Sequence, residues 1–143
     1  VTLIGEYAFE GCSSLTSVTI PDSITEIEGR TFSGCSSLTS VTIPDSVTEI
    51  GWSAFWGCTS LTSITIPASV TRIGQTAFYN CINMTNVYCK GTTPPSCGSY
   101  ILSYEDSGYS KKIDCKIYVP HVSVEAYKES WFMYADKIEG YDF

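Results

Sequence analysis

Positive charge is scarce in the first 89 residues of this 143-residue chain, where Arg30 and Arg72 are the only basic residues against seven acidic ones. The whole chain carries a formal net charge of −7. A surface of this sign repels a phosphate backbone, so we do not expect nucleic-acid binding. The chain also has no run of lysine and arginine that could hold an anionic membrane.

Histidine and long apolar runs are equally scarce. No stretch approaches the ~18 consecutive apolar residues of a membrane span, so no membrane insertion is expected. His121 is the sole histidine and follows Pro120 at a position expected to be a solvated turn. A catalytic serine or cysteine needs a base beside it. The chain also has no glycine-rich phosphate loop. The sequence therefore predicts a protein that is not an enzyme and uses no cofactor.

What the chain has in abundance is self-similarity. The stretch GCSSLTSVTIPDS occurs at residues 11–23 and again at 34–46, and the full unit, LTSVTIPxSVTxIGxxAFxxCxS, recurs with a step of 23 residues. The step links columns of equivalent residues: Leu15, Leu38, Leu61 and Met84; Val18, Val41, Ile64 and Val87; Phe9, Phe32, Phe55 and Phe78; and Cys12, Cys35, Cys58 and Cys81. One unit cannot bury its own apolar face, so a fixed step of this length predicts a solenoid of stacked coils.

Within each unit the pattern predicts two short strands. Within LTSVTI, Val18 and Ile20 alternate with Ser17 and Thr19, which is the period of a half-buried strand. The proline that follows lacks an amide hydrogen and ends the strand. A second extended piece, such as residues 47–50, comes next, and SAFWGC is expected to form a short helical or 3₁₀ turn that points Phe55 and Cys58 inward.

These features resemble the BspA-like leucine-rich repeats of bacterial surface proteins. The shared wording, LPxxVTxIGxxAFxxC, is seen here as IPDSVTEIGWSAFWGC. The resemblance covers residues 1 to about 89, and residues 116–143 are similar to the C-terminal capping segment of such arrays. It implies a leucine-rich-repeat solenoid, an α/β-type right-handed superhelix that is mostly β with a parallel strand ladder. It also implies a non-catalytic protein-interaction or adhesion module of a secreted or cell-surface bacterial protein.

The step divides the chain into two parts. Residues 1–89 are predicted to form the solenoid: a partial first repeat at 1–14, repeats at 15–37, 38–60 and 61–83, and a last strand at 84–89. Residues 90–143 are predicted to be a loop followed by a strand-helix cap. Residues 90–113 break the step and are rich in glycine, proline, serine and tyrosine, so they are expected to form a long loop.

The cap is expected to cover the end of the ladder. Its strand, residues 115–120, should turn Cys115, Ile117 and Val119 to one face. Ser123 is the expected N-cap of a helix with three core residues at helical spacing: Val124, Tyr127 and Trp131. At the other end Val1 falls in the middle of a repeat, so we expect either a fragment of a longer array or a bare edge that pairs with another chain, including a second copy.

Seven cysteines leave at least one thiol unpaired within the chain. The 23-residue spacing is unlike a zinc motif. Stacked equivalents about 4.8 Å apart that point the same way do not suit a disulfide. The favoured interpretation is a ladder of reduced core thiols at Cys12, Cys35, Cys58 and Cys81. A Cys97–Cys115 or Cys89–Cys97 bridge stays open as an alternative.

Acidic residues are also expected to stack, Asp22 on Asp45 and Glu26 on Glu49. We interpret them as a solvated edge, with a weak calcium site on the aspartates as the alternative.

Two sets of residues are candidates for partner binding. The first is the outward face of the strands, which is the usual binding surface of such arrays; its hydroxyl ladder would also suit ice binding. This face comprises Ser17, Thr19, Ser40, Thr42, Ser63 and Thr65. The second set comprises Trp52, Trp56 and Tyr79, whose columns tolerate polar residues and so should face outward. A protein partner is the first hypothesis; the alternatives are a carbohydrate-binding or accessory domain, through the aromatic set, and a structural spacer.

Overall fold

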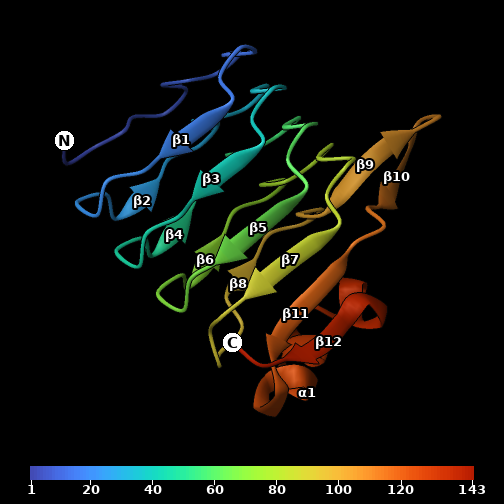
Figure 1. Ribbon diagram of the computed structural model, residues 1–143. Helices are drawn as coiled ribbons and strands as arrows, with labels where there is room; N and C mark the ends of the chain where they lie inside the picture. The colour runs from blue at the N-terminus through green and yellow to red at the C-terminus, as the bar shows by residue number, and fades with distance from the viewer.

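The computed structural model describes residues 1–143 and contains two ladders of parallel strands joined by turns (Figure 1). The outer ladder consists of β1 (Ser17–Thr19), β3 (Ser40–Thr42), β5 (Ser63–Ile66), β7 (Asn86–Cys89), β11 (Lys116–Pro120) and β12 (Ile138–Tyr141). Its strands pair in two groups, β1 with β3 and β5 through β7 and β11 to β12, while β3 and β5 are neighbours without strand pairing. The inner ladder consists of β2 (Glu26–Ile27), β4 (Glu49–Ile50), β6 (Arg72–Ile73) and β8 (Ser96–Cys97). The coils of β1, β3, β5 and β7 each contribute one strand to both ladders, whereas β11 and β12 have no inner counterpart. The strands of each ladder lie side by side in chain order (Figure 1).

The register of both ladders follows the 23-residue step. Val18 pairs with Val41 in the outer ladder, and Ile27 pairs with Ile50 in the inner one. Each residue therefore lies beside its equivalent in the next coil, and the predicted solenoid is confirmed.

The core is built from these equivalent residues. The rings of Phe9, Phe32, Phe55 and Phe78 stack on one another at centroid distances of 5.5, 5.4 and 5.3 Å along the column. The inward leucines and isoleucines pack beside them, and Leu38, Leu61 and Ile64 are buried. In the first coil Phe9 is only half-buried, because it has a neighbouring coil on one side alone.

The returns between the strands are turns, and SAFWGC forms no helix. Single bonds three residues apart, such as Trp56 N to Ser53 O at 3.1 Å, alternate there with bonds to the next coil, such as Phe55 N to Ala77 O at 2.8 Å. Phe55 and Cys58 point inward, as predicted, and are fully buried. The turns contain residues with a left-handed backbone conformation, which recur at two equivalent places in successive coils. The first of these columns contains no glycine, and the second is mostly glycine. These are Tyr7, Arg30, Ser53, Thr76 and Tyr100 in the first column, and Gly11, Gly34, Gly57 and Asn80 in the second.

Residues 90–113 are not the long loop that we expected. They contain β8, which pairs with β6 in the inner ladder, and a hairpin of β9 (Ser103–Asp106) and β10 (Tyr109–Lys112). Phe78 N donates to Ile101 O at 3.0 Å, so the coil continues. The hairpin lengthens this coil, and Tyr118 in β11 pairs with Tyr88 in β7 at a separation of 30 residues instead of 23. Because the added residues hide the step, the sequence pattern is lost although the ladder continues. The division of the chain at residue 89 stays a prediction.

The cap follows β11 and consists of η1 (His121–Ser123), α1 (Val124–Ser130), η2 (Phe132–Lys137) and β12. Cys115, Ile117 and Val119 are buried on one face, as predicted. Ser123 does occupy the N-cap position, but its hydroxyl donates to Thr92 O at 2.8 Å and does not cap the helix. None of the helices has the length and apolar character needed to cross a membrane.

Two buried side chains tie the cap to the preceding coil. Tyr127 Oη donates to Gly91 O at 2.8 Å, and Trp131 Nε1 donates to Pro95 O at 2.9 Å. Both side chains belong to the main core. Val124, the third predicted helix position, is half-buried against this core.

Candidate binding face

The hydroxyl face, defined as Ser17, Thr19, Ser40, Thr42, Ser63 and Thr65, lies on the outward side of β1, β3 and β5. All six residues are exposed. The pleat places them there because Val18, Val41 and Ile64 between them turn inward. This face carries no charged side chain on these three strands.

None of these six hydroxyls makes a hydrogen bond within the chain, whereas neighbouring threonines do. Thr39 Oγ1 donates to Thr16 O at 3.0 Å, and Thr85 Oγ1 donates to Thr62 O at 3.0 Å. Thr48 and Thr71 bond the preceding coil in the same way, at 3.2 and 3.3 Å. The hydroxyls beside the strands therefore join neighbouring coils, and those on the hydroxyl face have no partner within the chain.

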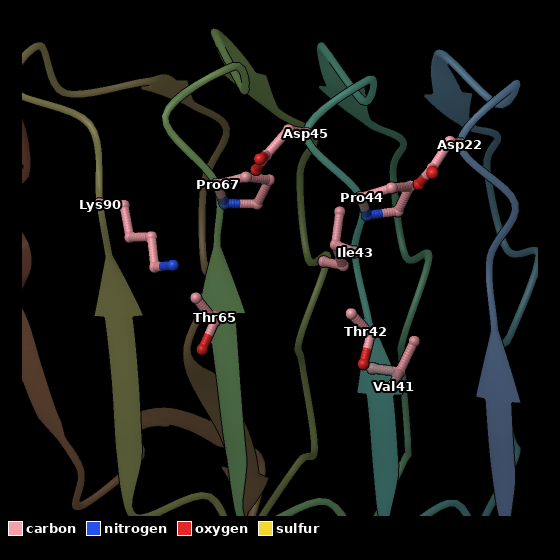
Figure 2. A pocket seen from close by; sticks show the side chains of 9 residues that line it. All are labelled: Asp22, Val41, Thr42, Ile43, Pro44, Asp45, Thr65, Pro67 and Lys90. Carbon is pink, nitrogen blue, oxygen red and sulfur yellow. The ribbon is translucent and has the colours of Figure 1, made fainter. Parts of the chain in front are cut away.

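A hollow of about 430 Å³ opens at the carboxyl ends of the outer strands. Figure 2 shows Thr42 and Thr65 on the strands below it, the Asp22 and Asp45 carboxylates along the turns, and the Lys90 ammonium on the far side. No ion pair joins Lys90 to either carboxylate. The hollow thus offers hydroxyls, unpaired acids and one cation within a single concave surface.

A second hollow, of about 330 Å³, lies beside the inner ladder and contains Glu6, Glu26, Glu28 and Glu49. Glu26 pairs in register with Glu49, as predicted. Burial raises the pKa of Glu26, and the nearby charges of Glu28 and Glu49 raise this pKa further. No cluster of three or more acids, histidines or cysteines in the chain is arranged to hold a metal ion, so nothing in the structure favours the calcium alternative.

The two tryptophans face outward, as predicted, with exposed fractions of 42% for Trp52 and 38% for Trp56. Trp52 lies over the backbone of Gly29, meets the ring of Tyr7 edge-on at 5.9 Å, and donates from Nε1 to Glu6 Oε1 at 3.2 Å. It therefore also covers the turn locally. No ring contact links the two tryptophans to each other.

Tyr79, the third aromatic candidate, is half-buried, and its hydroxyl lies 3.2 Å from the Ser110 hydroxyl of the hairpin. It makes no ring contact with either tryptophan. Tyr79 nevertheless lies in the coil next to Trp56, since Gly57 N donates to Tyr79 O at 2.8 Å.

Sequence reasoning missed a different aromatic group, the ring cluster of Tyr88, Tyr118, Tyr141 and Phe143. Tyr88 and Tyr118 stack at 5.1 Å, and Tyr118 and Tyr141 lie 5.3 Å apart. Phe143 meets Tyr141 at 4.9 Å. The available signal was that Tyr88 stands in the column of Thr19, Thr42 and Thr65, because a ring there departs from a run of small side chains.

The cysteine ladder is confirmed for three of its four members. Cys35, Cys58 and Cys81 are fully buried, whereas Cys12, in the first coil, is half-buried. The thiols donate to phenylalanine carbonyls of the preceding coil, Cys58 to Phe32 at 3.2 Å. Burial raises the pKa of Cys81 to about 12 and also raises that of Cys58, which favours the protonated form of both thiols.

All seven cysteines are free thiols in the structure, so neither alternative bridge is formed. Cys97 is half-buried in β8, and burial raises the pKa of its thiol. Burial also raises the pKa of Cys115, to about 11. His121 is exposed, and its Nε2 lies 3.2 Å from Asp142 Oδ1. No cysteine or serine lies within hydrogen-bond distance of this imidazole.

Comparison with solved structures shows similarity to bacterial proteins, two of which are described as leucine rich. A leucine rich cell surface protein of Faecalibacterium prausnitzii is 32% identical, with a TM-score of 0.64 over 86% of this chain and 40% of that one. The T. pallidum leucine rich repeat protein is 30% identical, with a TM-score of 0.64 over 85% of this chain and 52% of that one. Pneumococcal vaccine antigen PcpA shares the fold at 16% identity, with a TM-score of 0.69 over 98% of this chain and 40% of its own.

The chain therefore spans about half or less of each of these proteins. No curated protein sequence matches it significantly. The model of the BspA type leucine rich repeat region matches residues 2–139 in six copies. Since the match covers nearly the whole chain, including the hairpin and the cap, this chain belongs to the BspA-type leucine-rich repeat family.

Proposed function

We propose that the chain is a non-catalytic interaction module of a bacterial cell-surface or secreted protein, and that the hydroxyl face contacts a protein partner. The observation that carries this proposal is that six neighbouring hydroxyls lie on one exposed face and make no bond within the chain. Each can donate and accept a hydrogen bond, so the face can pair with the backbone or polar side chains of a partner.

The strands beneath the hydroxyl face support this role. Thr19 is held opposite Thr42 by the pairing of β1 with β3. Thr65 is held opposite Tyr88 by the pairing of β5 with β7. Because the backbone is fixed before binding, a partner does not have to order it, which lowers the entropic cost of association. The hollow at the strand ends adds Asp22 and Asp45, two carboxylates that could receive a cationic side chain.

A surface location is supported by the name of one relative, the leucine rich cell surface protein of Faecalibacterium prausnitzii. An exposed array with a large polar face suits adhesion to another cell or to its surrounding matrix. Adhesion to such a protein is therefore the specific form of the proposal.

The test measures binding of the chain to immobilised fibronectin, laminin and fibrinogen by surface plasmon resonance. We expect at least one of these to bind, and the triple variant Thr19→Ala, Thr42→Ala, Thr65→Ala to bind at least about tenfold more weakly. The matched control replaces three exposed hydroxyls away from the outer strands: Thr25→Ala, Thr92→Ala and Ser99→Ala. Equal binding by both triple variants, or no binding to any of the three proteins, would overturn the proposal.

A further inference from the structure

The ring cluster lies at the C-terminal end of the outer ladder, beyond the hydroxyl face. Its rings are those of Tyr88 in β7, Tyr118 in β11, Tyr141 in β12, and Phe143. Tyr88 is in contact with every other ring of the cluster: Tyr118 at 5.1 Å, Tyr141 at 5.5 Å and Phe143 at 6.5 Å. Tyr88 and Tyr118 are half-buried, while Tyr141 and Phe143 are 41% and 52% exposed. The cluster is therefore a surface feature and not part of the core.

The hydroxyls of the cluster are free, unlike those of the buried tyrosines nearby. Tyr127 Oη bonds Gly91 O, and Tyr134 Oη accepts from Leu102 N at 3.1 Å and lies 3.1 Å from Ser103 Oγ. The phenols of Tyr88, Tyr118 and Tyr141 have no partner within the chain. Buried tyrosine hydroxyls are normally bonded, so the cap satisfies its internal phenols and leaves those of the cluster for solvent or a ligand.

The cluster borders the hydroxyl face where Tyr88 lies beside Thr65, and this border is called the Tyr88–Thr65 edge. Tyr118 covers one face of the Tyr88 ring, with an angle of 18° between the two planes. On the other side, the register places Thr65 beside Tyr88, so a small side chain adjoins a large ring. Thr65 also lines the hollow of about 430 Å³, which lies on the side of Thr65 away from the rings and is lined by none of them.

Two pairs of opposite charges lie around the cluster. Lys116 Nζ lies 2.6 Å from Glu139 Oε1, and His121 Nε2 lies 3.2 Å from Asp142 Oδ1. The other outward neighbour on β7 is Asn86, whose side-chain amide is neutral and makes no bond within the chain. A ligand at the Tyr88–Thr65 edge therefore meets aromatic rings, hydroxyls and an amide, and the adjoining hollow adds unpaired charges of both signs, the Asp45 carboxylate and the Lys90 ammonium.

We propose that the Tyr88–Thr65 edge binds a neutral saccharide. One face of a pyranose ring carries C–H groups that pack against the half-buried ring of Tyr88 on the side of Thr65, and its hydroxyls bond Thr65, Asn86 and the free phenols. The proposal goes beyond the protein-binding role of the hydroxyl face and does not depend on it.

Isothermal titration calorimetry with three neutral hexasaccharides tests the proposal: the β-1,4-linked hexamers of glucose, N-acetylglucosamine and mannose. We expect at least one to bind, and both Tyr88→Ala and Phe143→Ser to weaken that binding, Tyr88→Ala by at least about tenfold because it removes the stacking surface. Tyr88→Phe keeps the ring and should bind within about threefold of the native chain. Phe143 is exposed at the edge of the cluster, so its variant keeps the test valid if Tyr88→Ala fails to fold.

The matched control is Tyr109→Ala, which removes a 75% exposed tyrosine of the hairpin that makes no ring contact. It should leave saccharide binding unchanged, as should the triple variant Thr25→Ala, Thr92→Ala, Ser99→Ala. The proposal is overturned if none of the three hexasaccharides binds, or if binding survives Tyr88→Ala. It is also overturned if Tyr88→Ala abolishes binding to fibronectin, laminin or fibrinogen while no saccharide binds, which would assign the cluster to a protein partner. Loss of protein binding alone, with saccharide binding intact, contradicts only the role of the hydroxyl face.

Discussion

Cys81 donates its thiol hydrogen to the backbone carbonyl oxygen of Phe55, with Sγ 3.1 Å from the oxygen. The same bond joins Cys35 to Phe9 at 3.2 Å, one coil after another along the array. Each of these cysteines fills a small apolar space and ties its coil to the phenylalanine column of the coil before. The column is thus a structural device that uses the thiol as a weak donor.

Thiol labelling tests this placement. In native protein we expect Cys12 and Cys97, the half-buried thiols, to react first with Ellman's reagent, and the five buried cysteines to react only when the chain unfolds. In denaturant without reductant all seven should titrate, since all are free. Rapid native labelling of Cys35, Cys58 and Cys81 would show that the ladder is misplaced, and a total of five thiols would reveal a disulfide.

Alkaline pH should weaken the fold through the same thiols. The pKa of Cys81 is raised from 9.0 to about 12 by burial, so between these values the unfolded chain loses a proton that the folded chain keeps. The stabilisation is complete below pH 9 and is lost as the pH rises toward 12, at up to ~1.4 kcal/mol per pH unit. In urea titrations from pH 9 to 10.5, Cys81→Ala should show a shallower decline than the native chain. Ser63→Ala, which removes no titrating group, should follow the native decline; parallel slopes for all three would contradict the prediction.

Phe55 occupies the middle of the stacked column, between Phe32 and Phe78, and is fully buried. Phe55→Ala should reduce the free energy of unfolding by about 3–5 kcal/mol, because it removes the ring and leaves a cavity between two coils. Phe9→Ala should cost clearly less, since Phe9 is half-buried. Urea denaturation followed by circular dichroism measures both, and equal losses would mean that the first coil is as well packed as the third.

The two kinds of threonine should respond differently to the loss of a hydroxyl. Thr39→Val breaks the bond to Thr16 O and should cost about 0.5–1 kcal/mol. Thr42→Val removes a hydroxyl that bonds nothing in the chain, and valine suits a strand, so its effect on the free energy of unfolding should be near zero. Thermal unfolding of the matched pair checks this, and an equal loss for both would show that Thr42 also holds the coils together.

Glycine is needed where adjacent coils approach each other at the turns. A Cβ at Gly74 would lie 2.4 Å from Trp52 N and 2.7 Å from Gly51 C, so the backbone must shift to admit it. Gly74→Ala should therefore destabilise the chain by about 2–3 kcal/mol. Gly5→Ala, whose Cβ meets nothing within 4 Å, is the control and should change the melting temperature little. Similar melting temperatures for the two variants would contradict the close approach.

Much of the fold could be predicted because residues that lie 23 positions apart in the sequence are paired with each other in the ladders. Val18 and Val41 are equivalent in the sequence and become paired neighbours in the ladder. The left-handed turn residues could not be predicted this way. Thr76, with a φ of 56°, is β-branched and carries no local signal for that conformation. Its backbone is fixed by the coils on either side and not by its own preference.

The candidate site was predictable only in part. The outward position of Thr42 and Thr65 follows from strand alternation, and the structure places them there. The ring cluster depends on pairings whose separations differ from 23. Tyr118 pairs with Tyr88 after a lengthened coil, and Tyr141 reaches the cluster through the pairing of Ile117 with Ile138 after a shortened one. Neither separation repeats, so no column in the sequence could reveal the contact.

The β9–β10 hairpin shows where this architecture tolerates extra chain. It adds residues to one coil while the strands on both sides, β7 and β11, remain paired in register. Lengthening a loop whose ends are already fixed costs only about 0.6 kcal/mol for each doubling of its length. The turn at Ser107 and Gly108 is therefore a natural insertion point, where a foreign peptide epitope could be displayed with each ladder strand left in place.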